Sequence, residues 1–168
     1  MSFQSSKVWG PISAAFYQPG ATHSHCRFIH GYGLKFKAIF SCTDLDARDW
    51  VMDFGGLKTF KQHLEAEYDH RLLVRRDDHR KDLLLRMEEA GLCQLTWRSN
   101  VGCEAFARHE GLWLQQWLND QPWNTQERYW NGQIGDEIVT QRVNVFSMEV
   151  MEHENNSAIW FHDKGSAR

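Results

Sequence analysis

Four features that would each place a protein in a definite class are missing from this sequence. None of its four cysteines forms a C-x-x-C pair. No window approaches the about 18 consecutive apolar residues of a membrane span. The N-terminus shows no basic start followed by an apolar run, as a signal peptide would. The net charge of -3 gives no overall basic field for nucleic acid. We therefore expect a cytoplasmic protein with reduced thiols.

The composition is that of a globular domain with many large aromatic side chains. The chain has 168 residues, of which 42% are hydrophobic and 24% charged, enough for one domain with one core. Eight Trp and ten Phe are many for this length. They indicate either a bulky core or large subunit interfaces, where aromatic residues are enriched. We expect a single domain over residues 1–168.

Hydrophobic periodicity predicts a mixture of strands and helices. Strands are expected at 7–16, 29–42, 93–97, 138–153 and 158–161, with a further extended run at 50–54. Helices are expected after a cap at Asp53, over 77–90, and over roughly 102–118 behind a cap at Ser99 or Asn100. A long surface loop is expected at 119–135 and a tail at 163–168. This order predicts an α+β fold in which antiparallel hairpins flank the helices.

One stretch concentrates chemically reactive side chains. Residues 23–32 hold three histidines and a cysteine at the entrance of the strand expected at 29–42. Imidazoles and a thiol gathered in this way favour catalysis or metal binding. The strand period of two places His30 and Tyr32 on the same side as Leu34. This stretch is therefore the first candidate for a functional site.

Two other patterns have ordinary structural explanations. A basic run covers residues 71–81, and the aspartates among and beside its cations favour a solvated helix entrance. Nucleic-acid binding is a poorer interpretation of the same run. The helix expected at 102–118 carries a stripe formed by Phe106, His109, Trp113 and Trp117. We interpret the stripe as core or interface rather than as a ligand platform.

Several short motifs occur in a set order between about residues 8 and 160. They are Ser13-Ala14-Ala15-Phe16, Cys26-Arg27-Phe28-Ile29-His30-Gly31-Tyr32, Val51-Met52-Asp53-Phe54-Gly55-Gly56-Leu57-Lys58, Asp69-His70-x-x-Leu73, Glu104 at a helix start, and Glu152 six residues before Ala158. In these pieces and their order the chain resembles the family of 6-pyruvoyl-tetrahydropterin synthase and bacterial 6-carboxytetrahydropterin synthase. The short Cys-x3-His spacing favours the bacterial 6-carboxy subtype.

The resemblance implies a fold, an assembly and a reaction. The fold would be the tunnelling fold, a β-β-α-α-β-β unit with an antiparallel sheet and helices on one face, here with an extra helix and a long loop. Subunits of this family form a homo-oligomer, commonly a trimer stacked into a hexamer, with active sites between subunits. The implied partner is a pterin, 7,8-dihydroneopterin triphosphate, whose triphosphate is eliminated on the way to queuosine or tetrahydrobiopterin. The basic run at 71–81 would then have another use, the attraction of the triphosphate.

The resemblance also implies roles for single residues. Cys26 would be the base, because the elimination needs a proton removed next to carbons that bear hydroxyls. Asp69 and His70 would relay the proton. Glu152 would hold the pterin N–H groups by charge-assisted hydrogen bonds, and Glu104 would be a second substrate contact.

Each of these residues also has a plainer interpretation. Cys26 could be a buried apolar thiol. Asp69 and His70 could be a helix C-terminus with a favourable histidine, and Glu104 an acidic residue that needs only the helix dipole. Glu152 could be a solvated strand residue. On sequence spacing alone the plainer interpretation of the Asp69–His70 pair is preferred, and the resemblance favours function.

The zinc site is where the sequence departs from the family. The family holds zinc through three histidines, one after Ala-Ala and two in His-Gly-His, but Phe16 and Tyr32 stand at the first and third positions here. Only His30 remains, and catalytic zinc normally takes three protein ligands. Either His23 and His25 join His30 to rebuild the site, or zinc is lost. In the second case the protein would be a weak enzyme, act on a related pterin, or be a non-catalytic pterin- or purine-binding homologue.

Overall fold

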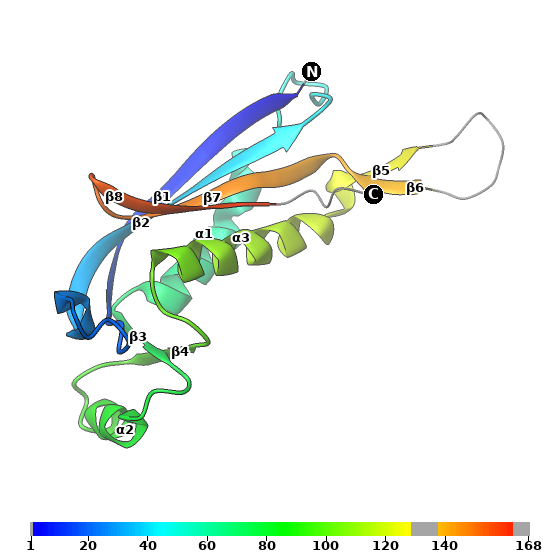
Figure 1. Cartoon of the computed structure of the whole chain (residues 1–168). Helices are drawn as coiled ribbons and strands as arrows, with labels where there is room; N and C mark the ends of the chain where they lie inside the picture. Colours follow the sequence, from blue (N-terminus) through cyan, green and yellow to red (C-terminus); the bar gives the residue numbers. More distant parts are fainter. Residues whose placement is uncertain (1, 129–137, 163–168) are drawn as a thin grey trace.

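The computed structural model describes residues 2–128 and 138–162 (Figure 1). Its central strand is β2, His30–Cys42, in which Leu34, Phe36, Ala38 and Phe40 are completely buried. Their spacing of two places all of them on one face. β1, Phe3–Phe16, pairs antiparallel with the whole of β2, from Phe3 opposite Cys42 to Phe16 opposite His30. The end of this ribbon therefore brings Phe16 beside the histidine-rich stretch.

The rest of the sheet is mixed in direction. β7, Val143–His153, pairs antiparallel with β2, and β8, Asn156–Phe161, pairs antiparallel with β7. On the other side, β3, Arg71–Arg75, runs parallel to β1, and β4, Leu95–Arg98, runs parallel to β3. The strand order is β4-β3-β1-β2-β7-β8. The prediction of an antiparallel sheet is thus wrong for the β3–β4 edge, whose strand β3 is too short to show a periodic pattern.

Two helices cover one face of the sheet (Figure 1). α1, Lys58–Tyr68, and α3, Cys103–Asn119, enclose with β2 and β7 a core whose largest fully buried side chains include Phe36, Phe60, Tyr68, Phe106 and Met148. At Gly111 a Cβ atom would lie 2.2 Å from the ring of Trp160, so α3 can approach β8 this closely only with glycine there. The α+β class is confirmed.

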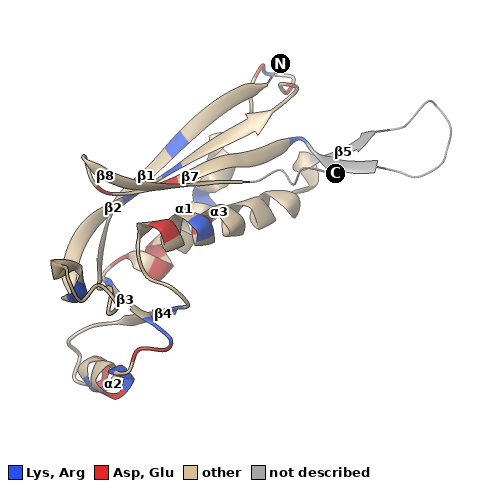
Figure 2. Ribbon diagram, viewed as in Figure 1, with Lys and Arg blue, Asp and Glu red and all other residues tan. Residues whose placement is uncertain are grey.

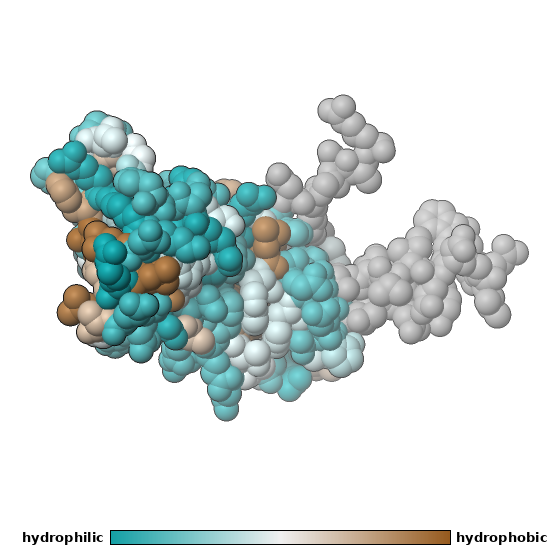
Figure 3. Space-filling model, turned by 90° about the horizontal axis from the view of Figure 1, so that it is seen from below, coloured by the Kyte–Doolittle hydropathy of each residue, from teal (hydrophilic) through white to brown (hydrophobic). Residues whose placement is uncertain are grey.

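A small unit stands apart from this core. α2, Lys81–Glu89, packs against β3 and β4, and its Leu84 joins Tyr17, Leu72, Val74 and Leu95 in a second buried cluster. Seen from below, hydrophobic residues gather at the end of the molecule that carries this unit (Figure 3). We call β3, α2 and β4 together the β3-α2-β4 unit. It contains the extra helix that was expected beyond the tunnelling-fold unit.

Several expected boundaries need correction. The chain after Asp53 forms a 3-10 turn, η2, Phe54–Leu57, before α1, and the Asp53 carboxylate accepts a 2.8 Å hydrogen bond from Gly55 N–H. Residues 50–54 are therefore not a strand. α3 begins after Gly102, at φ 134°, without a side-chain cap. The expected cap at Ser99 or Asn100 is wrong because the chain makes its turn at this glycine instead.

The expected loop at 119–135 contains regular structure. A 3-10 turn, η3, Pro122–Asn124, leads into β5, Thr125–Arg128, which pairs with β6, Ile138–Gln141. The expected strand 138–153 is divided at Arg142, because buried Asn124 exchanges side-chain hydrogen bonds with the backbone of Val143 at 2.6 and 2.9 Å. Residues 129–137 and the predicted tail at 163–168 lie outside the described residues.

The buried face of α3 is centred one position away from the expected stripe. Phe106 is buried, but His109 is 47% exposed and Trp113 and Trp117 lie at the edge of the core. Glu110 is completely buried instead. Its carboxylate takes 2.7 Å hydrogen bonds from His63, Tyr68 and His109. A charged side chain can lie in this core because several donors satisfy it.

Candidate functional site

The β1–β2 ribbon assembles the three positions at which the family would place zinc ligands. Phe16 is opposite His30 in the strand register, and Ala14 is opposite Tyr32. The ring of Phe16 lies 5.0 Å from that of Tyr32 and 6.0 Å from that of His30, measured between centroids. Phe16 is only 2% exposed. The expected shared side of His30 and Tyr32 is therefore present, with a phenyl ring packed against it.

His30 and Tyr32 form a directed hydrogen-bond chain. The Nδ1 atom of His30 is 2.6 Å from the carbonyl oxygen of Phe28, and Nε2 is 2.5 Å from the Tyr32 hydroxyl. Because a carbonyl only accepts, Nδ1 donates to it, and Nε2 of the neutral ring accepts from Tyr32. Burial, followed by the charges of Glu152, Cys26 and Cys103, raises the pKa of Tyr32 to about 12. Tyr32 is therefore a neutral donor at physiological pH.

These side chains do not fit a three-histidine zinc site. Phe16 has no donor atom, and the free lone pair of His30 is used by Tyr32. His23 and His25 are exposed on the loop before β2. Within residues 2–128 and 138–162, no three His, Cys, Asp or Glu side chains are grouped to share a metal ion. The rebuilt site of His23, His25 and His30 is therefore not assembled in this conformation.

Cys26 lies on the same loop, in the 3-10 turn η1, His25–Arg27. The Ser24 hydroxyl accepts a hydrogen bond from Cys26 N–H at 3.2 Å and begins the turn. The carbonyl of Cys26 accepts from Gln18 N–H at 2.7 Å, which attaches the turn to the end of β1. The thiol is half-buried, and it is one of the groups whose charge acts on Tyr32. The loop thus holds Cys26 beside the residues that follow β1.

Both predicted substrate-binding glutamates line one cavity of about 320 Å³. Glu104 comes from the first turn of α3, and Glu152 from the end of β7. Cys103 and Gln18 also line the cavity, together with the residues 155–158 of the β7–β8 turn. Burial and a hydrogen bond to Glu152 raise the pKa of the Cys103 thiol. We call this cavity, which has two carboxylates and no basic side chain in its lining, the acidic cavity.

Asp69 and His70 form a pair at the surface. His70 Nδ1 lies 3.0 Å from Asp69 Oδ1, and the two side chains are 80% and 43% exposed. The backbone of His70 has φ 56°, and its N–H donates to Ser13 O at 2.7 Å, which anchors the turn on β1. No hydrogen bond or ion pair links this pair to Cys26 among the described residues.

A family model described as 6-pyruvoyl tetrahydropterin synthase matches residues 8–163. The chain belongs to the 6-pyruvoyl tetrahydropterin synthase family. The family resemblance read from the motifs is confirmed, and so is the tunnelling fold, with the mixed edge described above.

Solved structures share this family's fold at low sequence identity. An uncharacterised protein from Wolinella succinogenes is 18% identical with a TM-score of 0.74, over 97% of this chain and 99% of that one. The 6-pyruvoyl tetrahydropterin synthase of Caenorhabditis elegans is 14% identical with a TM-score of 0.58, over 96% of each chain. That of Plasmodium falciparum is 11% identical with a TM-score of 0.60, over 95% of this chain and 96% of that one. No curated protein matches the sequence.

In this member of the 6-pyruvoyl tetrahydropterin synthase family, sequence reasoning misses Cys103 and Gln18. Cys103 directly precedes Glu104, which is the one available signal that it faces the same cavity. Gln18 stands in a turn, and only the fold brings its amide to Val101 O at 3.4 Å. No described helix is long and apolar enough to cross a membrane.

Proposed function

We propose that this family member is a pterin-pathway lyase that eliminates triphosphate from 7,8-dihydroneopterin triphosphate. The acidic cavity carries the proposal, because Glu104 and Glu152 lie together there and Glu152 acts electrostatically on Tyr32. A pterin ring offers N–H and amino donors along one edge, and carboxylates accept such donors in charge-assisted hydrogen bonds. The cavity has no cation in its lining, so it suits the ring rather than the phosphates.

In the proposed elimination, Cys26 is the base. In the proposed step the Cys26 thiolate takes a proton from a side-chain carbon of the substrate. The electron pair of that C–H bond forms a carbon–carbon double bond, and the adjacent C–O bond breaks. Triphosphate leaves as the anion. The Tyr32–His30 pair stands where the family has zinc ligands, so a metal Lewis acid is not part of this step and we expect slow turnover.

The exposed Asp69–His70 pair supports a site that is shared between subunits. Since its side chains face solvent in one chain, we propose that a homo-oligomer, a trimer or a hexamer, brings the pair of one subunit to Cys26 of another. Two inactive variants, Cys26→Ala and His70→Ala, test this when they are co-expressed. Mixed oligomers should regain activity, whereas sites within single chains would stay inactive in every mixture.

The reaction itself is tested with purified, untagged protein whose metal content is measured first. Given 7,8-dihydroneopterin triphosphate, the protein should release inorganic triphosphate, and Cys26→Ala should lower the rate by about 10²–10⁴-fold. The proposal fails if no triphosphate appears with or without added zinc. If a panel of pterins then still raises the melting temperature, the protein is a binding homologue without turnover.

A further inference from the structure

The basic side chains around the β3-α2-β4 unit fall into two groups. Arg75 is neutralised by Asp77 at 2.6 and 2.8 Å, and Arg80 by Asp78 at 3.2 Å. In the part of the chain that the structure describes, Arg71 and Arg76 have no ion pair or side-chain hydrogen bond. The ammonium group of Lys81 lies over the face of Trp97, 5.5 Å from the ring centroid, and has no ion pair among the described residues. The second group is therefore free to meet an anion.

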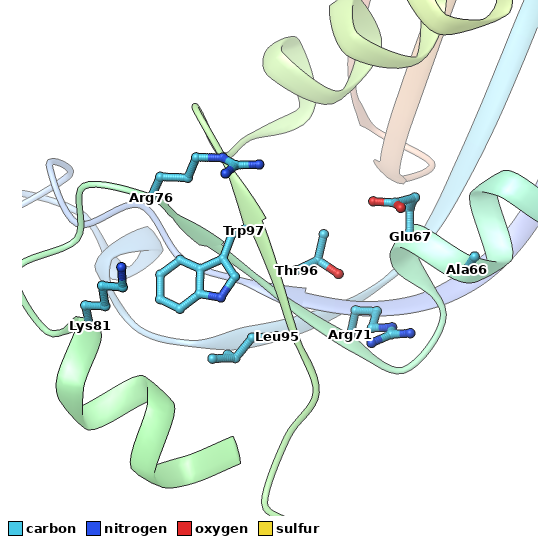
Figure 4. A pocket seen from close by; sticks show the side chains of 8 residues that line it. All are labelled: Ala66, Glu67, Arg71, Arg76, Lys81, Leu95, Thr96 and Trp97. Carbon is cyan, nitrogen blue, oxygen red and sulfur yellow. The ribbon is translucent and has the colours of Figure 1, made fainter. Parts of the chain in front are cut away.

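These free cations line one cavity of about 550 Å³, which we call the basic cavity. In Figure 4, Arg76 and Lys81 flank the indole of Trp97 on one side of β4, while Arg71 and Glu67 lie on the other side. Thr96 adds a hydroxyl on the side of Arg71 and Glu67. Glu67 is the one acidic side chain in the lining, and it is already paired with Arg98 at 3.1 Å. The cavity is thus positive in a protein whose net charge is -3.

A smaller cavity of about 220 Å³ continues the basic surface. It shares Arg76 and Trp97 with the basic cavity and adds Arg98, Arg108 and His109. The Arg98 side chain is 9% exposed, and its Nε atom has no hydrogen-bond partner among the described residues. A buried donor without a partner is costly unless something else satisfies it. Figure 2 shows that basic residues recur along β3 and β4, where the two cavities lie.

The basic surface is separated from the acidic cavity by the first turn of α3. Glu104 lines the acidic cavity, while the next residue, Ala105, lines the smaller basic one. The ring contacts and acceptors proposed for the pterin therefore lie on one side of this turn, and the free cations on the other. A ligand of the basic cavity would not compete for Glu152.

We propose that the basic cavity binds a phosphorylated aromatic compound of the nucleoside phosphate class. Guanidinium and ammonium groups bind phosphate oxygens by charge-assisted hydrogen bonds. The indole of Trp97 is half-buried, and a planar base can stack on it when the Lys81 ammonium group, which lies over the ring, turns to the phosphate. The volume falls within the roughly 300–1,000 Å³ that small-molecule sites occupy. This site is independent of the proposed pterin reaction.

Calorimetric titration of the full chain at low ionic strength tests the proposal, with ATP, adenosine and inorganic triphosphate as probes. ATP should bind more tightly than either of the others. Arg76→Gln and Lys81→Gln should each weaken ATP binding about tenfold. Trp97→Leu should weaken ATP binding but leave the binding of inorganic triphosphate unchanged.

Arg75→Gln is the matched control, because it removes the same charge from the same segment at a cation that Asp77 already neutralises. It should change ATP affinity less than about twofold. Circular dichroism and melting temperature should show that all variants are folded. The proposal is overturned by absence of ATP binding, by an equal loss in Arg75→Gln, or by inorganic triphosphate binding as tightly as ATP. Preference for single-stranded oligonucleotides over ATP would overturn it as well.

Discussion

The acidic cavity and the basic cavity are opposite in charge. The acidic cavity has two carboxylates and no basic side chain in its lining, whereas the basic cavity has Arg71, Arg76 and Lys81 against the single, already paired Glu67. The first is built from the tunnelling-fold elements α3, β7 and the end of β1. The second is built mainly on the β3-α2-β4 unit. The β3-α2-β4 unit therefore brings a surface whose ligand chemistry differs from that of the acidic cavity.

The two cavities also differ in the residues that hold their charged side chains in place. Behind the acidic cavity, Glu152 is supported by one thiol, that of Cys103. Behind the basic surface, buried Glu110 holds His109 at 2.7 Å, and His109 in turn meets Arg98 at 3.0 Å. Arg98, which lines the smaller cavity, is thus positioned by a core carboxylate. This difference predicts that the position of Arg98 depends on the charge of Glu110.

The largest effect is expected from Glu110→Gln. The substitution removes the charge that His63, Tyr68 and His109 are arranged to meet, and breaking such a buried set costs roughly 3–5 kcal/mol. Urea denaturation should show this loss in the free energy of unfolding. Glu65→Gln is the control, because Glu65 is an exposed partner of Lys61 and should change the stability by less than about 1 kcal/mol. An equal loss in the free energy of unfolding for Glu110→Gln and Glu65→Gln would contradict the stabilising role of buried Glu110.

The Glu110 carboxylate should also make the stability of the protein depend on pH. Burial alone would raise the pKa of Glu110, but hydrogen bonds from His109 and His63, together with their charges, lower it to about 2 from an ordinary 4.5. Because the folded value is the lower one, the stabilisation is present above about pH 4.5 and is lost as the pH falls towards 2. This difference between the ordinary and the folded pKa of Glu110 corresponds to about 3 kcal/mol of stability.

Denaturation curves of the wild type and of Glu110→Gln isolate this contribution. Their difference in the free energy of unfolding should shrink as the pH falls from about 4.5 to about 2. Other carboxylates titrate equally in both proteins and cancel in the comparison. A difference that stays constant over this range would mean that Glu110 acts through its shape and not through its charge.

The antiparallel part of the sheet could be predicted from the sequence, and its parallel edge could not. β2 shows Leu34, Phe36, Ala38 and Phe40 in strict alternation. β3 has only Leu72, Leu73 and Val74 between two arginines, so its pairing with β1 is a tertiary contact without a local signal. The basic run at 71–81 was expected to be a solvated helix entrance. Its first part is this strand, with Arg71 at its start and Arg76 directly after its end, and both line the basic cavity.

The candidate site, like the sheet, is predictable from the sequence only where neighbouring residues determine it, and not where distant segments meet. The strand period predicts that His30 and Tyr32 share a side, and the structure adds the hydrogen bond between them. Glu104 and Glu152 are 48 positions apart, and only the packing of α3 on β7 brings them to one cavity. Among the described residues no hydrogen bond or ion pair joins Asp69–His70 to Cys26, so their shared role stays a prediction from the family motifs.

Glu152→Gln should weaken pterin binding in the acidic cavity. The amide keeps the shape but loses the charge that accepts pterin N–H groups, and hydrogen bonds to a charged group contribute about 1.5–3 kcal/mol. Pterin affinity should fall about 10–100-fold, measured by fluorescence quenching with a non-reacting pterin. ATP affinity should not change. A parallel loss of ATP binding would show that the two cavities are one site.

The smallest effect is expected from salt, and it separates the two cavities without any mutation. Attraction between an anion and the exposed cations of the basic cavity is screened as ionic strength rises, because the Debye length falls from about 14 Å at 50 mM to about 7 Å at 200 mM. ATP binding should therefore weaken several-fold over this range. A neutral pterin held by short hydrogen bonds to Glu104 and Glu152 carries no net charge to screen, so its affinity should change less than about twofold. If both affinities fall together, the pterin also uses the cations, and the basic run at 71–81 serves the substrate triphosphate rather than a second ligand.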